Sequence, residues 1–322
     1  MAFKSYPKLS AITQEISLNR SGLVADCIFP KVQTGCQFGV IDWTGELKDL
    51  KSISDHVTCK SDANEIDTGA MALAFHGTQD RALLQSLEEC CVEVCGVTNL
   101  NEQIAARKTQ SMTNKLLIGR EERAIKLATD TTKYVDNLLL APSAATAVVD
   151  GGLFNLTLAN FNDPNFGLLR YFQGINENSL FGSRNVMVTD IATLNGLLTH
   201  PQFIGSGCVV DPMTSSSKVA SLLGLSKICI ADGKYNDGIA ETVNIKKLWP
   251  KGTILFTSSY EFITAQDPQL AFGLTAFSQD LEQYTFNDPK KGKGEGMLMQ
   301  KIGHDLTELV LSYKAATLVK IA

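Results

Sequence analysis

The eight cysteines are the residues best able to react or to bind a metal, and their spacing argues against one reactive centre. They are Cys27, Cys36, Cys59, Cys90, Cys91, Cys95, Cys208 and Cys229. CCVEVC is the one cluster, and it lacks the second close pair or the nearby histidine that a zinc site needs. Because the cysteines lie among apolar neighbours, the sequence favours buried free thiols over disulfides and over a metal site.

The other motifs that could carry catalysis or bind phosphate are incomplete. The histidines are far apart in the sequence, and solvated or capping roles are expected for all of them: His56, His76, His200 and His304. No serine lies in a G-x-S-x-G elbow. The glycine-rich GKGEG, residues 292–296, follows no clean strand-to-helix pattern and predicts a hairpin turn. We therefore expect no catalytic residue, no cofactor and no bound metal, and the chain is not predicted to be an enzyme.

The composition is typical of a soluble globular protein. The chain has 322 residues, of which 44% are hydrophobic and 20% charged, enough for one large domain or two modest ones. No apolar run reaches the roughly 18 residues of a membrane span. The first residues lack the apolar core of a secretory signal, so we expect a protein kept in a cytosol. The net charge of -5 argues against a dedicated nucleic-acid binder.

The longest expected element is a charged helix over residues 101–135. It contains no proline, and some thirty residues at 1.5 Å each give a rod of roughly 45 Å. Its apolar stripe is narrow and consists of Ile104, Met112, Leu116, Leu117, Ala124, Leu127 and Ala128. Such a helix lies on a sheet on one side and faces a polar partner on the other. Arg120, Glu121 and Arg123 of its GREER segment predict either surface ion pairs within the helix or a polar contact with a second copy.

The segments around this helix predict mostly strands. Alternation in CQFGVIDW and in MALAF predicts two strands that bracket about twenty polar residues, and hence a protruding loop. Strands and helices alternate over residues 185–275, which predicts a compact α/β unit. The C-terminal stretch predicts a strand, a tight polar loop and a strand-rich tail tied into a sheet. The pattern of ALLQSLEECCVEV alone allows either helix or strand.

Four segments resemble, in order and spacing, the major capsid proteins of tailed double-stranded DNA bacteriophages, with their Hong Kong 97-like capsid fold. They are GLVADCIFPKVQTGCQFGVIDW (22–43), LLIGREERAIKLATDTTKY (116–134), NVMVTDIATLNGLLTHPQFIG (185–205) and VASLLGLSKICIADGKYN (219–236). The motifs are diffuse, and the resemblance covers roughly residues 20–275.

The resemblance implies an α+β fold with five parts. These are an N-terminal arm (1–38), an extended β-hairpin loop (39–80), a peripheral domain (81–184) whose long spine helix is residues 101–135, an axial α/β domain (185–275), and a return to the peripheral domain (276–322). It also implies that ALLQSLEECCVEV is the strand returning from the loop.

The function implied by the resemblance is structural. Copies would assemble as pentamers and hexamers into the icosahedral shell around a phage double-stranded DNA genome, in a virion capsid built in the host bacterial cytoplasm. Scaffolding, portal and decoration proteins are implied partners. Contact with DNA would be non-specific, and no membrane is involved. If Met1 is the encoded start, scaffolding would come from a separate protein or be dispensable.

Candidate contacts between subunits are the GREER residues Arg120, Glu121 and Arg123 and the loop lysines Lys48, Lys51 and Lys60, to which no crosslinking chemistry is assigned. Two alternatives stay open. One is an encapsulin-type nanocompartment shell protein, and the other is a cytosolic α/β enzyme with its site in residues 185–275.

Overall fold

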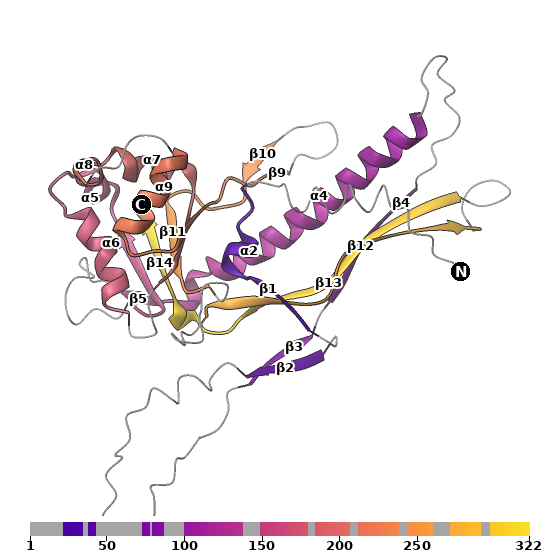
Figure 1. Cartoon of the computed structure of the whole chain (residues 1–322), viewed down its shortest axis with the longest axis horizontal. Helices are drawn as coiled ribbons and strands as arrows, with labels where there is room; N and C mark the ends of the chain where they lie inside the picture. Colours follow the sequence, from indigo (N-terminus) through magenta and orange to yellow (C-terminus); the bar gives the residue numbers. More distant parts are fainter. Residues whose placement is uncertain are drawn as a thin grey trace, which may run out of the picture.

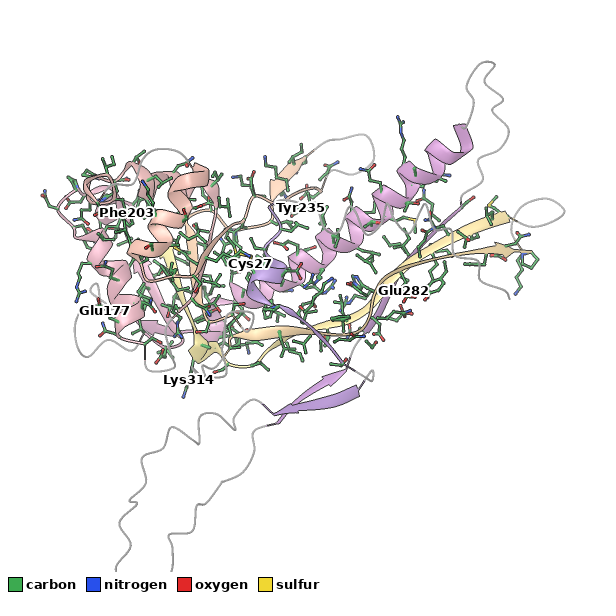
Figure 2. The ribbon with its side chains drawn as sticks, viewed as in Figure 1. Cys27, Glu177, Phe203, Tyr235, Glu282 and Lys314 are labelled. Atoms are coloured by element: carbon green, nitrogen blue, oxygen red, sulfur yellow. A yellow bond between two sulfur atoms is a disulfide. The ribbon has the colours of Figure 1, made fainter. Side chains whose placement is uncertain are left out.

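The chain consists of a lobe of sheet and helices from which a long helix and a long β-hairpin extend side by side (Figure 1). This computed structural model describes residues 22–34, 38–42, 73–77, 79–86, 100–137, 149–179, 184–206, 212–237, 244–259, 271–290 and 297–322. Cys27 lies centrally, between the lobe and the extended part (Figure 2).

A six-stranded sheet forms the centre of the lobe. Its strands, in spatial order, are β5 (Val135–Asn137), β6 (Gly152–Leu156), β14 (Ala316–Ile321), β11 (Thr253–Thr257), β7 (Val186–Thr189) and β8 (Lys227–Ile230). β7 and β11 are buried at every residue, as expected of strands covered on both faces. β14 confirms that the apolar C-terminal tail is tied into a sheet, because it pairs with β11 on one side and β6 on the other.

The helices of the lobe are α5 (Leu158–Asn162), α6 (Leu168–Glu177), α7 (Ile191–Thr199), α8 (Pro201–Gly205) and α9 (Pro212–Leu222). Their apolar faces share a core with the sheet that includes Phe172, Phe203 and Phe256. Asp190 caps α7 by accepting the N–H of Thr193. The alternation of strand and helix predicted over 185–275 is confirmed.

His200 has the predicted capping role. Its Nδ1 accepts the N–H of Gln202 at the start of α8, and its Nε2 lies 3.1 Å from the carbonyl oxygen of Asp163. His200 thereby joins α8 to the turn after α5.

A four-stranded sheet runs out from the lobe. Its strands are, in order, β1 (Lys31–Gln33), β12 (Gly273–Asp288), β13 (Met297–Val310) and β4 (Gln79–Ser86). β12 and β13 pair antiparallel, as expected of the predicted strands, with register shifts between Phe277 and Glu282. The predicted GKGEG turn (292–296) lies outside the described residues. β4 pairs antiparallel with β13, so the part of ALLQSLEECCVEV that lies within the described residues is a strand.

The long helix α4 runs from Leu100 to Ala128 and lies along this sheet (Figure 1). Its start agrees with the sequence, and so does the buried stripe of Met112, Leu116, Leu117, Ala124 and Ala128, whereas the side chain of Ile104 lies outside the described part. Its predicted end at residue 135 is wrong. The side chain of Asp130 accepts the N–H of Thr132 and opens a 3-10 turn, η1 (Thr131–Lys133), that leads into β5. Asp and Thr side chains compete for backbone groups in this way, which ends helices.

Two short hairpins complete the described fold. β2 (Phe38–Asp42) pairs antiparallel with β3 (Leu73–Gly77), which confirms the two strands predicted at the base of the loop. The residues between them, which include Lys48, Lys51 and Lys60, lie outside the described residues. β9 (Lys234–Asn236) and β10 (Ile245–Lys247) form the other hairpin.

The sheets cross the domain boundaries implied by the resemblance. β5, β6 and β14 come from segments assigned to the peripheral domain, yet they pair in one sheet with β7, β8 and β11 of the axial segment. The parallel pairing of β14 with β6 joins residues far apart in the sequence. A local pattern predicts a strand but not the strand with which it pairs. The domain boundaries expected from the resemblance therefore do not coincide with the boundaries of the sheets.

Candidate functional site

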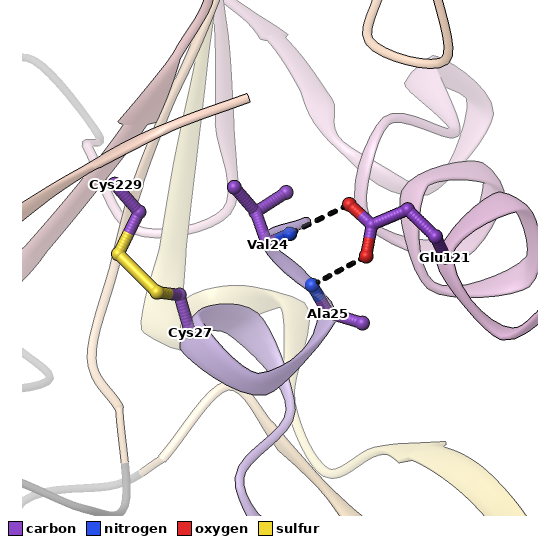
Figure 3. Close-up of a disulfide and its surroundings, with 5 residues drawn as sticks. All are labelled: Val24, Ala25, Cys27, Glu121 and Cys229. Carbon is purple, nitrogen blue, oxygen red and sulfur yellow. Dashed lines mark hydrogen bonds between the residues drawn. A yellow bond between two sulfur atoms is a disulfide. The ribbon is translucent and has the colours of Figure 1, made fainter. Parts of the chain in front are cut away.

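Glu121 binds the start of a short helix from the N-terminal part of the chain, α2 (Ala25–Ile28). Its two carboxylate oxygens accept the N–H groups of Val24, at 2.7 Å, and Ala25, at 2.8 Å (Figure 3). These N–H groups lie at the start of α2, where a helix has no partner for its own donors. Burial raises the pKa of Glu121, and the two hydrogen bonds oppose that rise. Glu121 therefore ties α4 to α2.

Arg120 makes the second tie between the two helices. Its Nη2 lies 2.7 Å from Oδ1 of Asp26 and 3.2 Å from the hydroxyl of Thr275 on β12. Only 4% of the Arg120 side chain is exposed, against 67% for Asp26. Arg120 thus connects α4 both to α2 and to the four-stranded sheet.

Arg123 fixes α4 to β13. Its Nε and Nη2 donate to the two carboxylate oxygens of Glu308 at 3.1 and 3.0 Å, while Nη1 donates to the carbonyl of Gly119. A bidentate pair of this kind sets the orientation of both side chains. The Glu308 side chain is nearly buried, whereas 27% of Arg123 is exposed.

The surface pairs predicted for GREER within the helix are therefore wrong. Arg120, Glu121 and Arg123 all bind groups of the same chain that lie 94, 97 and 185 residues away in the sequence. A signal was available, because Arg120 and Glu121 follow Leu116 and Leu117 by four residues and precede Ala124 by four and three. They continue the buried stripe of α4 and are not on its solvated face.

The contact between the first half of α4 and the sheet is largely polar. Thr109 and Thr113 of the helix are buried, and so are Gln283 and Gln300 on strands of the sheet. The amide of Gln300 donates to the Thr109 hydroxyl at 2.7 Å. The accompanying apolar cluster is small, with Met112, Leu116 and Ile302 as its buried members. Polar layers stabilise such a contact less than apolar packing does, since each group must first lose its water.

His304 on β13 belongs to this polar layer, so its predicted solvated or capping role is wrong. It is 3% exposed. Burial, followed by the nearby Arg123 and Arg120, lowers the pKa of His304 to about 4. The imidazole is therefore neutral near pH 7, where the two guanidinium groups already supply positive charge.

A second buried ion pair holds the starts of three lobe strands together. Arg184, just before β7, places Nη2 2.6 Å from Oδ1 of Asp150, just before β6. The same Nη2 donates to the carbonyl of Lys314, just before β14. The Arg184 side chain is 0% exposed, and burial lowers its pKa to about 10 despite the raising effect of Asp150.

Cys27 and Cys229 form a disulfide between α2 and β8 (Figure 3). The prediction of free buried thiols is wrong for this pair. The two residues are 202 positions apart, and their Cα atoms are 6.7 Å apart, a separation that a disulfide can span. No local pattern could pair them, because the pairing depends on where α2 settles on the sheet. The other six cysteines lie outside the described residues.

Removing the charge of Glu121 provides a local test of the α2 contact. Glu121→Gln leaves one carbonyl oxygen for two buried N–H groups and turns an NH₂ group toward one of them. We expect a loss of about 2 kcal/mol in the free energy of unfolding, measured by denaturant titration of the purified chain. Glu122→Gln, at an exposed position next to it, is the matched control and should change stability by less than about 0.5 kcal/mol. Equal effects at the two positions would contradict the capping role.

The described residues hold no group of three or more His, Cys, Asp or Glu side chains that could bind a metal ion. Among the described helices, none is both long enough and apolar enough to cross a membrane. Arg120, Glu121 and Arg123 instead lie where α2, α4 and the two sheets contact one another, and we call this region the junction. A long helix laid along a long hairpin, beside an α/β lobe, is the arrangement expected from the resemblance to capsid proteins of tailed phages.

The comparison with solved structures shows this fold over the whole chain. A phage-related protein from Bordetella bronchiseptica has a TM-score of 0.62 at 15% identity, covering 99% of this chain and 98% of the other. The capsid of cyanophage P-SCSP1u gives 0.54 at 12% identity, covering 92% and 86%. A virus-like particle from Pyrococcus furiosus gives 0.52 at 9% identity, covering 98% and 99%. No family model matches the sequence. No curated protein sequence matches it either.

Proposed function

We propose that this chain is the major capsid protein of a tailed double-stranded DNA phage, and that copies of it assemble into an icosahedral shell. The observation that carries the proposal is the capsid fold, matched over 92% or more of the chain by each of the three structures above. The role is structural, and we assign no catalytic step to the chain. Its place is the virion capsid, and its assembly takes place in the bacterial cytoplasm.

The geometry suits a shell subunit. Arg120, Glu121 and Arg123 fix α4 to the rest of the subunit, so that the helix and the long β12–β13 hairpin can transmit force as one body. The same hairpin and the β2–β3 pair extend away from the lobe (Figure 1), where they can overlap neighbouring copies. Contacts between unlike faces of identical subunits close into rings when the rotation closes. Many weak contacts of this kind add up to a stable particle.

We assign the parts of the chain accordingly. The loop (39–80) overlies a neighbour, whereas α2 and β1 of the arm (1–38) pack within their own subunit. The spine helix lies in the peripheral domain, and the tip of the axial domain (185–275) gathers around the axes of pentamers and hexamers. Lys48, Lys51 and Lys60 remain candidate contacts between subunits, and so does the partly exposed Arg123. For Arg120 and Glu121, which their own chain buries, we now propose a role within the subunit.

The charge of the chain fits a wall that encloses DNA without binding it tightly. Affinity for phosphates comes from clustered lysine and arginine, and the net charge here is -5. A separate scaffolding protein, a portal and a decoration protein are the partners that such a shell would use.

The contents of purified particles test this proposal against its runner-up. A phage capsid protein co-expressed with its packaging proteins should yield particles that contain double-stranded DNA. Particles that contain one dominant foreign protein, identified by mass spectrometry, would favour an encapsulin-type shell, which could share this fold. A compact oligomer of a few subunits under all conditions would instead support the cytosolic enzyme with a site in residues 185–275.

A further inference from the structure

We propose that Cys27 and Cys229 are a redox latch, present as two thiols while the subunit folds and assembles and joined as a disulfide once the particle meets an oxidising medium. The inference rests on the proposed function, which places assembly in a bacterial cytoplasm and the finished particle outside the cell. Stable disulfides are rare in a reducing cytosol. A disulfide in a chain of cytosolic origin is accounted for if the bond closes after assembly.

The bond adds a tie that the other contacts of α2 do not make. Glu121 and Arg120 hold α2 to α4. Thr275 holds the end of α2 to β12, because its hydroxyl donates to the carbonyl of Phe29 and its N–H donates to that of Pro30. The disulfide reaches in the other direction, to β8 of the six-stranded sheet (Figure 3). Its closure therefore links the N-terminal segment, the spine helix and the lobe in one covalently closed unit.

The reduced chain keeps the two sulfur atoms close. Val24, Ala25, Ile28 and Phe29 are buried in the same apolar core as Cys229. A hydrogen bond also joins the residues just before α2 to those just after β8, because the N–H of Asp232 donates to the carbonyl of Gly22 at 3.2 Å. These contacts do not depend on the S–S bond. Oxidation can therefore proceed in the folded subunit without rearrangement of the backbone.

The order of the chemistry follows from exposure. Cys27 is partly exposed and Cys229 is 5% exposed, so the Cys27 thiolate reacts first. With oxidised glutathione, Cys27 Sγ forms a bond to one glutathione sulfur, and the other glutathione leaves as a thiolate. Cys229 then loses its proton, attacks Cys27 Sγ and expels the second glutathione thiolate. The two cysteines lose two protons and two electrons in all, and one glutathione disulfide becomes two thiols.

Closure should stabilise the subunit. A bond between residues 202 positions apart restricts the unfolded chain strongly, since the effect grows with the length of the closed loop. We expect the oxidised form to melt higher than the reduced form by roughly 5 °C or more.

The experiment measures the bond and the stability separately. Cells that express the full chain are lysed directly into denaturant with iodoacetamide, and peptides that contain Cys27 and Cys229 are examined by mass spectrometry. A second sample is purified, exposed to oxidised glutathione and then treated in the same way. We expect alkylated thiols in the first sample, linked peptides in the second, and a higher melting temperature after oxidation.

Two variants provide the controls. Cys27→Ser and Cys229→Val each remove one sulfur, so they should assemble as the reduced wild type does and gain no stability from oxidised glutathione. Linked peptides in the directly alkylated lysate would overturn the latch, because the bond would then precede assembly. Linkage without any rise in melting temperature would also overturn it. Both readouts work on the unassembled subunit, so a chain that forms no shell would count against the proposed function and not against the latch.

Discussion

Replacement of Arg184 by methionine is expected to lower the free energy of unfolding by about 3–5 kcal/mol, one of the two largest effects among our predictions. The substitution keeps a long side chain but leaves the carboxylate of Asp150 buried without its cation. Because Arg184 also donates to the carbonyl of Lys314, the starts of β6, β7 and β14 all lose a contact. Denaturant titration of the unassembled chain, followed by the fluorescence of the buried Trp249, measures the loss.

The matched control is the exposed pair of Arg170 and Glu177. Its Nη1–Oε1 distance is also 2.6 Å, but 60% and 53% of the two side chains are exposed. Arg170→Met should therefore cost less than about 1 kcal/mol. The double variant Arg184→Met/Asp150→Leu should recover part of the loss, since no unpaired charge remains. A similar cost at Arg170 and Arg184 would contradict the view that burial makes the Arg184 pair important.

Acid is expected to lower the free energy of unfolding of the chain through His304, by roughly 3 kcal/mol in full. The folded chain holds the pKa of His304 at about 4, below its ordinary value of 6.5. Between these two values the unfolded chain binds a proton that the folded chain does not. Stability contributed by the neutral imidazole is therefore complete above pH 6.5 and is lost as the pH falls to about 4.

His304→Gln isolates this contribution from other acid effects. The variant should be less dependent on pH between 6.5 and 4 than the wild type, and the difference between the two curves is the quantity to measure. The subtraction is needed because protonation of Glu121 has the opposite effect on the free energy of unfolding. Burial raises its pKa, so the folded chain takes up its proton more readily than the unfolded chain does. Parallel curves for the wild type and His304→Gln would show that His304 does not carry the effect.

The elements that could be predicted from the sequence are those set by local periodicity. The stripe of α4, the alternation at β2 and β3, and the strand and helix pattern from β7 to β8 all follow from residues close in the chain. The end of α4 was missed because apolar spacing says little about Asp130, whose side chain binds the backbone and starts a 3-10 turn. In this case the local chemistry of one side chain outweighed the wider pattern.

The junction was harder to predict because its partners are distant in the sequence. The spacing within α4 could have placed Arg120 and Glu121 on its buried stripe, but it could not name their partners, which depend on the position of α2. The same dependence hides the Cys27–Cys229 bond and the place of β14 beside β6. The resemblance supplied the fold in outline, but it could not supply the contacts of these particular side chains. At this junction, each contact joins residues that are far apart in the sequence, so no short segment predicts it.

Because of the polar layer between α4 and the four-stranded sheet, we expect the two halves of α4 to differ in local stability. Beyond Glu121, α4 joins a large apolar core through Ala124, Ile125 and Ala128. From residue 105 to residue 115, the buried side chains of the helix are Thr109, Met112 and Thr113, and two of these three are polar. Because apolar burial is the larger stabilising contribution, we expect amide hydrogens before Leu116 to exchange faster than those after Glu121. Hydrogen-exchange mass spectrometry of the unassembled chain measures this, and equal protection along the helix would contradict it.

The most direct test of the central claim, that copies of this chain close into a shell, is cryo-electron microscopy of the purified full-length protein, expressed with its scaffolding protein if one is required. The account predicts closed icosahedral particles of pentamers and hexamers. In each subunit, Arg120, Glu121 and Arg123 should keep their partners within the chain, and the β2–β3 and β12–β13 hairpins should lie against neighbouring copies. A compact assembly of a few subunits, with these hairpins free of any neighbour, would contradict it.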